Sequence, residues 1–205
     1  MEALLLDFGG VLTTNVFESF RQFSEAEGLE PQAVKRLFRE SPEALALLRR
    51  LERGELDENE FAELFAPHLG ITDHEGMVQR LFAGMGPDEP MLEAVRRARA
   101  AGIKTGLISN SWGAGIAYDG LALDELFDGV VISGEVGMHK PNADIFLLGA
   151  ERAGAAPGEC VFVDDLRENC AGAEAVGMRA ILHRGAETTL PIAEQLLGVS
   201  LRAGD

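Results

Sequence analysis

Four short segments of the chain carry side chains that could act together on an anionic substrate. Each segment follows an apolar run or precedes a turn-forming residue, and together they offer carboxylates, a hydroxyl, an amide and an ammonium group. They are Asp7, Ser109-Asn110, Lys140 and Asp164-Asp165. In open α/β sheets, sites assemble just beyond the carboxyl ends of the strands. If the apolar runs are neighbouring parallel strands, the four segments meet at one edge of a sheet.

Asp7 is the candidate nucleophile. It follows the apolar run of residues 4–6, which predicts a buried parallel strand, and it precedes Gly9 and Gly10. The two glycines let backbone N–H groups approach an anion closely. A carboxylate placed there can attack phosphorus or carbon and form a covalent intermediate. The alternative is that Asp7 only caps the turn or the helix that follows.

The acidic pair indicates a metal site. Asp164 and Asp165 directly follow the predicted buried strand of residues 160–163. Two adjacent carboxylates that lose hydration repel each other, which is costly unless a cation compensates them. Oxygen ligands of this kind suit Mg²⁺, which takes one or two carboxylates and a substrate oxygen. One of the two aspartates could instead cap the next helix.

Lys140, Ser109 and Asn110 are candidate ligands of an anion. Lys140 stands before a proline that limits its movement, and it could neutralise a phosphate or the charge of a transition state. Ser109 ends a predicted buried strand, where its hydroxyl either donates to a bound oxyanion or caps a helix, and Asn110 could do either. Trp112 and Tyr118 follow, and they either line the same pocket or pack the loop.

Apolar periodicity places these residues on a series of helices and strands. Residues 14–84 predict consecutive helices without a strand, with Ser41 before a first-turn proline and Asp57 with Glu60 as a capping box. From residue 88 on, helices and strands alternate, which implies a parallel sheet covered on both faces. The strands predicted there are residues 105–108, 129–132, 160–163 and 179–182, with helices at 91–102, at 142–153, up to about 176 and after 182.

The predicted fold class is therefore α/β, a doubly wound, Rossmann-like parallel sheet core with a small α-helical cap inserted after the first strand. We expect the core to comprise residues 1–14 and 85–205, and the cap residues 15–84. Phe17, Phe20 and Phe38 recur at helical spacing, which favours a hydrophobic core of the cap over a pocket that selects the substrate.

Composition excludes several kinds of partner. The 205 residues carry a net charge of −16, so the surface repels nucleic acid and anionic membranes. No apolar run approaches the ~20 residues of a membrane span, and the N-terminus lacks the pattern of a signal peptide. We expect a cytoplasmic monomer or homodimer with neither nucleic acid nor membrane as a partner. Cys160 and Cys170 are expected to be inert core thiols.

With these segments in this order, the chain resembles the haloacid dehalogenase-like (HAD) superfamily. It is most similar to a subgroup with a helical cap, which includes the phosphatase domain of soluble epoxide hydrolases and bacterial sugar-phosphatase-like proteins. The resemblance extends from Leu4 to about Leu182, and it is strongest over residues 134–141 and 163–169.

The resemblance implies a role for each candidate residue. Asp7 would form an aspartyl-phosphate, and Lys140 would neutralise charge and secure Asp7. Ser109 and the backbone N–H groups near Phe8, Gly9 and Gly10 would hold phosphate oxygens. Mg²⁺ would lie between the Asp7 side chain, the Gly9 carbonyl and Asp165, with Asp164 close by or acting through water.

One position departs from the family pattern. Family phosphatases usually carry a second aspartate two residues after the nucleophile, which protonates the leaving group and then activates water, and here that position is Gly9. A positioned acid contributes roughly 10²–10⁴ in rate. The chain could be slow, could use substrates with good leaving groups, or could recruit another group. Thr14, Asn15 and Glu18 lie near in sequence, although nothing singles one out.

Three functions are compatible with these residues. The first is a Mg²⁺-dependent phosphatase of a small phosphorylated metabolite, favoured by the acidic pair and Lys140. The second is a 2-haloacid dehalogenase, in which Asp7 would attack carbon without a metal; Gly9 is compatible with it and the acidic pair argues against it. The third is a catalytically weak or silent domain that binds a phosphorylated metabolite, supported by Gly9 alone.

Overall fold

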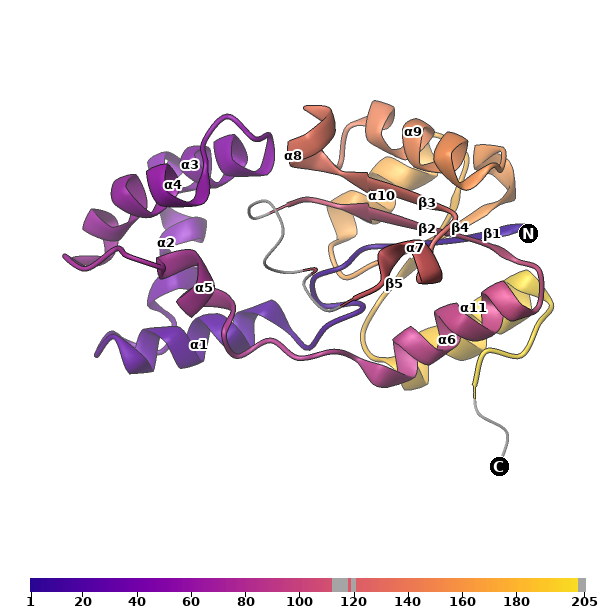
Figure 1. The fold of residues 1–205 in the computed structure, drawn as a ribbon, viewed down its shortest axis with the longest axis horizontal. Helices are drawn as coiled ribbons and strands as arrows, with labels where there is room; N and C mark the ends of the chain where they lie inside the picture. Colours follow the sequence, from indigo (N-terminus) through magenta and orange to yellow (C-terminus); the bar gives the residue numbers. More distant parts are fainter. Residues whose placement is uncertain (112–117, 119–120, 203–205) are drawn as a thin grey trace.

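Five parallel strands form the centre of the molecule. They are β1 (Ala3–Leu6), β2 (Lys104–Ser109), β3 (Gly129–Ile132), β4 (Cys160–Asp164) and β5 (Arg179–Leu182). The computed structural model describes residues 1–111, 118 and 121–202, and Trp112 lies outside these residues. The strands lie in the order β3-β2-β1-β4-β5, so β1 is central and the chain extends the sheet first on one side of it and then on the other (Figure 1).

Helices cover both faces of the sheet (Figure 1). Successive side chains of a strand point to opposite faces, so Leu4 and Leu6 pack in one apolar cluster and Leu5 in another. The first cluster includes residues of α6 (Glu89–Ala100) and α11 (Ala186–Leu197), and the second includes residues of α9 (Ala143–Ala153) and α10 (Arg167–Ala175). The predicted α/β class with a doubly wound, Rossmann-like sheet is confirmed. Shorter helices are α7 (Leu123–Leu126), α8 (Ser133–Val136) and η2 (Pro157–Glu159).

Between β1 and α6 the chain forms a separate group of helices, which lies to one side of the sheet (Figure 1). Their apolar faces pack into a cluster of their own that includes Phe20, Phe61 and Phe65. The predicted helix starts are present, because the Ser41 hydroxyl accepts the Ala44 N–H at 3.1 Å and a capping box joins Asp57 and Glu60. These helices are α1 (Val16–Ala26), α2 (Ala33–Glu40), α3 (Pro42–Glu52), α4 (Glu58–Phe65), η1 (Ala66–Leu69) and α5 (Met77–Phe82).

The two connections between the helical group and the sheet run side by side. Thr13 and Pro87 form an antiparallel bridge. The Thr14 N–H donates to the Gly86 carbonyl at 2.8 Å, and the Gly86 N–H donates to Thr14 Oγ1 at 3.0 Å. We propose that the chain divides at this bridge, into a core of residues 1–14 and 85–205 and a cap of residues 15–84.

A second contact joins the helical group to the sheet at the end of α3. The Ser133 hydroxyl donates to the backbone carbonyl of Glu52, and its oxygen accepts the Ser111 N–H at 2.8 Å. Gly54 has a φ of +69°, and a Cβ there would lie 2.6 Å from the Gly134 carbonyl oxygen, so the backbones approach closely. The end of α3 is therefore held against α8.

Among the described helices, none combines the length and the hydropathy that a membrane span requires.

The two cysteines, Cys160 and Cys170, are buried and are not paired with each other. Burial raises the pKa of both thiols to about 11, so both stay protonated at neutral pH.

Candidate active site

Asp7 stands directly beyond the carboxyl end of the central strand. β1 pairs in parallel with both β2 and β4, and the pairing brings Leu6 beside Leu107 and Val163. The Asp7 N–H continues this pattern by donating to the Val163 carbonyl at 2.9 Å. Residues that end or follow the three strands therefore meet Asp7 at one edge of the sheet, as the apolar runs predict.

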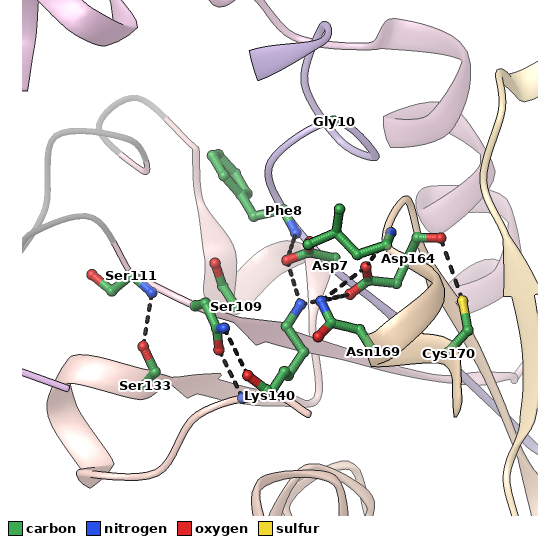
Figure 2. Close-up of polar contacts among 12 residues, drawn as sticks. Asp7, Phe8, Gly10, Ser109, Ser111, Ser133, Lys140, Asp164, Asn169 and Cys170 are labelled. Atoms are coloured by element: carbon green, nitrogen blue, oxygen red, sulfur yellow. Dashed lines mark hydrogen bonds and ion pairs between the residues drawn. The ribbon is translucent and has the colours of Figure 1, made fainter. Parts of the chain in front are cut away.

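The Lys140 ammonium lies between two carboxylates (Figure 2). Its Nζ is 2.7 Å from Asp7 Oδ1 and 2.8 Å from Asp164 Oδ2, and its side chain is fully buried. Burial lowers the pKa of Lys140, but the charges of the two aspartates outweigh it, and the net shift is upward. Lys140 is therefore a fixed positive charge beside Asp7.

Asn110 positions Lys140 through its backbone. The Asn110 side-chain amide donates to the Lys140 carbonyl at 3.2 Å, and its carbonyl oxygen accepts the Lys140 N–H at 2.9 Å. The sequence left open whether Asn110 binds an anion or caps a helix. In the structure this side chain lies in the cavity wall and joins the end of β2 to the Lys140 segment.

The two adjacent aspartates have different surroundings. Asp164 is fully buried, and its carboxylate accepts hydrogen bonds from the Asn169 amide at 3.0 Å and from the Leu166 N–H at 2.8 Å, in addition to Lys140. Asp165 is half-buried and lines a cavity. Asp164 is therefore the anchor of Lys140, whereas Asp165 is the member of the pair that faces the cavity.

Three carboxylates converge at this edge. One oxygen each of Asp7, Asp164 and Asp165 lies within 4.8 Å of the others. Burial raises the pKa of Asp7 to about 7, against the opposing effect of Lys140, and Asp164 raises it further. Burial and the Asp164 charge likewise raise the pKa of Asp165 to about 6. An oxygen-only cluster that resists its own ionisation fits a divalent cation such as Mg²⁺.

The turn after Asp7 packs against this cluster. The Phe8 N–H donates to Asp7 Oδ1 at 2.7 Å, and the Gly10 N–H donates to Thr13 Oγ1 at 3.1 Å. Gly10 has a φ of +76°, and a Cβ there would lie 2.8 Å from Asp165 Oδ2. Of the turn residues, Phe8 and Gly9 line the cavity, and Gly10 lies behind them against Asp165.

Ser109 and Tyr118 form a hydroxyl pair in the cavity wall. The Tyr118 hydroxyl donates to Ser109 Oγ at 2.7 Å, and its ring packs on Phe8 with 4.6 Å between ring centroids. Burial raises the pKa of Tyr118 to about 12, so it remains a donor at neutral pH. Because Ser109 accepts this bond, its own hydroxyl hydrogen is available to a bound oxygen. Tyr118 thus lines the pocket, one of two alternatives that the sequence left open.

These groups open into a cavity of about 550 Å³ between the sheet edge and the helical group. Its other wall is largely apolar and includes Phe17, Phe20 and Phe38. Phe20 and Phe38 also pack in the cluster of the helical group, and Phe17 is 41% exposed. The sequence favoured a core role for these phenylalanines, and the structure places them in the cavity wall as well.

The sequence did not identify two polar neighbours of the site. Asn169 supports Asp164 from the first half of α10, and Glu52 reaches the cavity from the end of α3. An amide four residues after Asp165 would have indicated Asn169 as a candidate, but nothing local distinguishes Glu52 from other glutamates at helix ends.

The three residues suspected near Gly9 are engaged elsewhere. Thr14 accepts the Gly86 N–H, and Asn15 caps α1 by accepting the Phe17 N–H at 2.8 Å. Glu18 pairs with Arg21 on the exposed surface of α1. None of the three is among the described residues that line the cavity.

The family model of haloacid dehalogenase-like hydrolases matches residues 1–177, and the chain belongs to this family of hydrolases. Fructose-1-phosphate phosphatase of Escherichia coli is 36% identical over 118 residues, 56% of this chain and 62% of that protein. Bifunctional epoxide hydrolase 2 of Sus scrofa is 33% identical over 118 residues, 55% of this chain and 21% of that protein. Both alignments cover less than two thirds of the relative.

Solved structures show the same fold. An HAD family enzyme of Bacteroides thetaiotaomicron, solved as the wild-type protein in complex with magnesium and inorganic phosphate, matches with a TM-score of 0.66 at 21% identity. The match covers 90% of this chain and 94% of that chain. The resemblance that the four motifs indicate is therefore confirmed for the family and for the fold.

Proposed function

We propose that the protein is a Mg²⁺-dependent phosphatase of a small phosphorylated metabolite that acts through an aspartyl-phosphate on Asp7. The observation that carries this proposal is the contact of Asp7 with the fully buried Lys140 ammonium, beside an acidic cluster and in the wall of the cavity. The similarity to a fructose-1-phosphate phosphatase supports a small phosphorylated substrate.

In the first step a carboxylate oxygen of Asp7 attacks phosphorus, and the bond between phosphorus and the ester oxygen breaks with its electron pair going to that oxygen. Lys140 neutralises charge that builds on the phosphoryl oxygens, and the Ser109 hydroxyl donates to one of them. In the second step water attacks the same phosphorus, which returns the Asp7 carboxylate and releases inorganic phosphate.

The metal would be held by this chain's oxygen atoms. Asp7 and Asp165 would supply carboxylate oxygens and Gly9 its backbone carbonyl, with Asp164 beside them. Mg²⁺, when bound, supplies positive charge that offsets the charge of the phosphoryl group. The raised pKa values of Asp7 and Asp165 support this assignment, because an adjacent cation favours the ionised forms.

The proposal is tested by phosphate release from sugar, acyl, nucleoside and p-nitrophenyl phosphates, with Mg²⁺ and with EDTA. Mg²⁺-dependent release that is lost in Asp7→Asn supports it, whereas undiminished release by this variant overturns the nucleophile. Release of halide from 2-haloacids without metal would identify a dehalogenase. Phosphate binding without turnover by stoichiometric enzyme would identify a silent binding domain.

A further inference from the structure

The proposed phosphatase chemistry requires a proton donor that the turn after Asp7 does not supply. An alkoxide leaves poorly unless it is protonated, and water attacks an acyl phosphate faster when a base removes its proton. Gly9 has no side chain, and Thr14, Asn15 and Glu18 do not reach the cavity. A recruited donor would therefore come from elsewhere in the described cavity wall.

Few described wall residues carry a carboxyl or an imidazole group. The carboxyl groups are those of Asp7, Glu52, Asp165 and Glu168, and the wall also contains His139. Asp7 and Asp165 are assigned to the nucleophile and the metal, and Glu168 is exposed. His139 Nδ1 lies 3.0 Å from the Lys140 carbonyl oxygen, and this contact holds the His139 ring against the backbone of the next residue. Among the described wall residues, Glu52 is the remaining carboxyl group, and it is half-buried.

Glu52 is held in place by the contact between α3 and α8. Its own carbonyl accepts the Ser133 hydroxyl, and Gly54, two residues on, packs against the Gly134 backbone. Ser133 is itself tied to the Ser111 N–H just after β2. The backbone that carries the Glu52 side chain is thereby held relative to the strand ends that carry Ser109 and Asp7.

The surroundings of Glu52 suit proton transfer at neutral pH. Burial raises the pKa of Glu52 to about 7, and the charges of Lys140, Arg49 and Arg53 oppose this rise, whereas Glu168 adds to it. Both protonation states are therefore populated near pH 7, which is the condition that favours a residue acting first as an acid and then as a base.

We propose, on the basis of the phosphatase function above, that Glu52 is the general acid and base of the reaction, supplied from the helical group in place of a side chain at Gly9. As Asp7 attacks phosphorus and the ester bond breaks, the Glu52 proton passes to the leaving oxygen and gives a neutral alcohol. The Glu52 carboxylate then takes a proton from the water that attacks the aspartyl-phosphate. Hydrolysis returns Asp7 as a carboxylate and Glu52 in its protonated form.

The test compares Glu52→Gln with the native protein on substrates whose leaving groups differ in basicity. Because kcat/KM reports only the steps up to transfer of phosphate to Asp7, a missing acid lowers it most for substrates with basic leaving groups. We expect a loss of about 10²-fold or more for glycerol and sugar phosphates and a clearly smaller loss for p-nitrophenyl phosphate. A burst of p-nitrophenolate equal to the enzyme concentration is expected when hydrolysis of the aspartyl-phosphate becomes slow.

Glu168→Gln is the matched control, because it removes an exposed carboxyl group from the same cavity wall, and His139→Gln tests the imidazole group in that wall. Equal losses on all substrates in Glu52→Gln, or a steeper dependence on the leaving group in His139→Gln, would overturn the role of Glu52. Glu52→Asp, which keeps a carboxyl group, should recover part of the lost activity. If the native protein releases no phosphate from any substrate, the proposed function itself fails, and this outcome is distinct from the others.

Discussion

The side chain of Asn110 is hydrogen-bonded to both backbone groups of Lys140, accepting from its N–H at 2.9 Å and donating to its carbonyl at 3.2 Å. The Asn110 amide thus supplies the two hydrogen bonds that a neighbouring strand would otherwise make with the N–H and the carbonyl of Lys140. Lys140 contacts Asp7 and Asp164 from a segment without regular secondary structure. The position of its ammonium group therefore depends on these two hydrogen bonds of Asn110.

Asn110→Ala is therefore expected to lower both stability and activity. It removes the acceptor of the partly buried Lys140 N–H and one of two contacts of the Lys140 carbonyl, which also lies 3.0 Å from His139 Nδ1. The loss costs about 1–3 kcal/mol, and it loosens the ammonium at Asp7. Denaturant unfolding and kcat measure the two effects. Asn142→Ala is the control, because Asn142 also lines the cavity but its side chain makes no cap hydrogen bond to α9. Equal effects of the two substitutions would contradict a role of Asn110 in positioning Lys140.

Asp7→Asn is expected to raise thermal stability at pH 8 in EDTA. The folded protein raises the pKa of Asp7 from 3.8 to about 7, chiefly through burial, so the protonated form is favoured by folding. This contribution to stability is present below pH 3.8 and is lost as the pH rises through 7. A neutral amide avoids that loss. Calorimetry should show a Tm difference that shrinks towards pH 4, and a less stable variant at pH 8 would contradict this account.

Mg²⁺ is expected to stabilise the protein more at pH 8 than at pH 5.5. Its ligands bind as carboxylates, and the pKa values of Asp7 and Asp165 are about 7 and about 6 without metal, so protons compete with the cation at the lower pH. The rise of Tm with Mg²⁺ concentration at both pH values measures this. Asp165→Asn should lose the response and Glu168→Gln should keep it. A response independent of pH would place the cation elsewhere.

Gly10→Ala is expected to weaken Mg²⁺ binding through Asp165. Gly10 has a φ of +76°, and an added Cβ would lie 2.8 Å from Asp165 Oδ2, so the carboxylate must move. Gly28→Ala provides a matched control, because Gly28 has a φ of +70° and a Cβ there would meet nothing within 4 Å. Both variants lose roughly 1 kcal/mol of stability from the backbone conformation. Only Gly10→Ala should also raise the Mg²⁺ concentration needed for half-maximal activity.

Local patterns identified the fold because each depends on residues close in sequence. The apolar runs predicted the strands of residues 129–132 and 179–182 with the bounds that the structure shows. The run before Asp7 is apolar on both faces because helices cover both sides of the sheet, and this placed Asp7 at its carboxyl end.

The roles of individual polar groups were harder to predict from the sequence, because they depend on contacts between segments that are distant in sequence. Asn110 acts on residue 140, and Glu52 is placed by a contact with residue 133. Asp164 and Asp165 are the same residue type at adjacent positions, and only the packing of Asn169 and Lys140 makes the first a buried anchor. A sequence pattern cannot assign such roles, because the partners are brought together by the fold.

The bridge between Thr13 and Pro87 also bears on how this protein can change during evolution. Because the chain leaves and rejoins the sheet at this one place, residues of the helical group outside its contact with α8 can vary together without breaking any strand pairing. The cavity wall opposite Asp7 is encoded within that unit. Selection can thus alter the shape of the cavity through one continuous stretch of gene, while the strand ends with Asp7, Ser109 and Asp165 stay as they are.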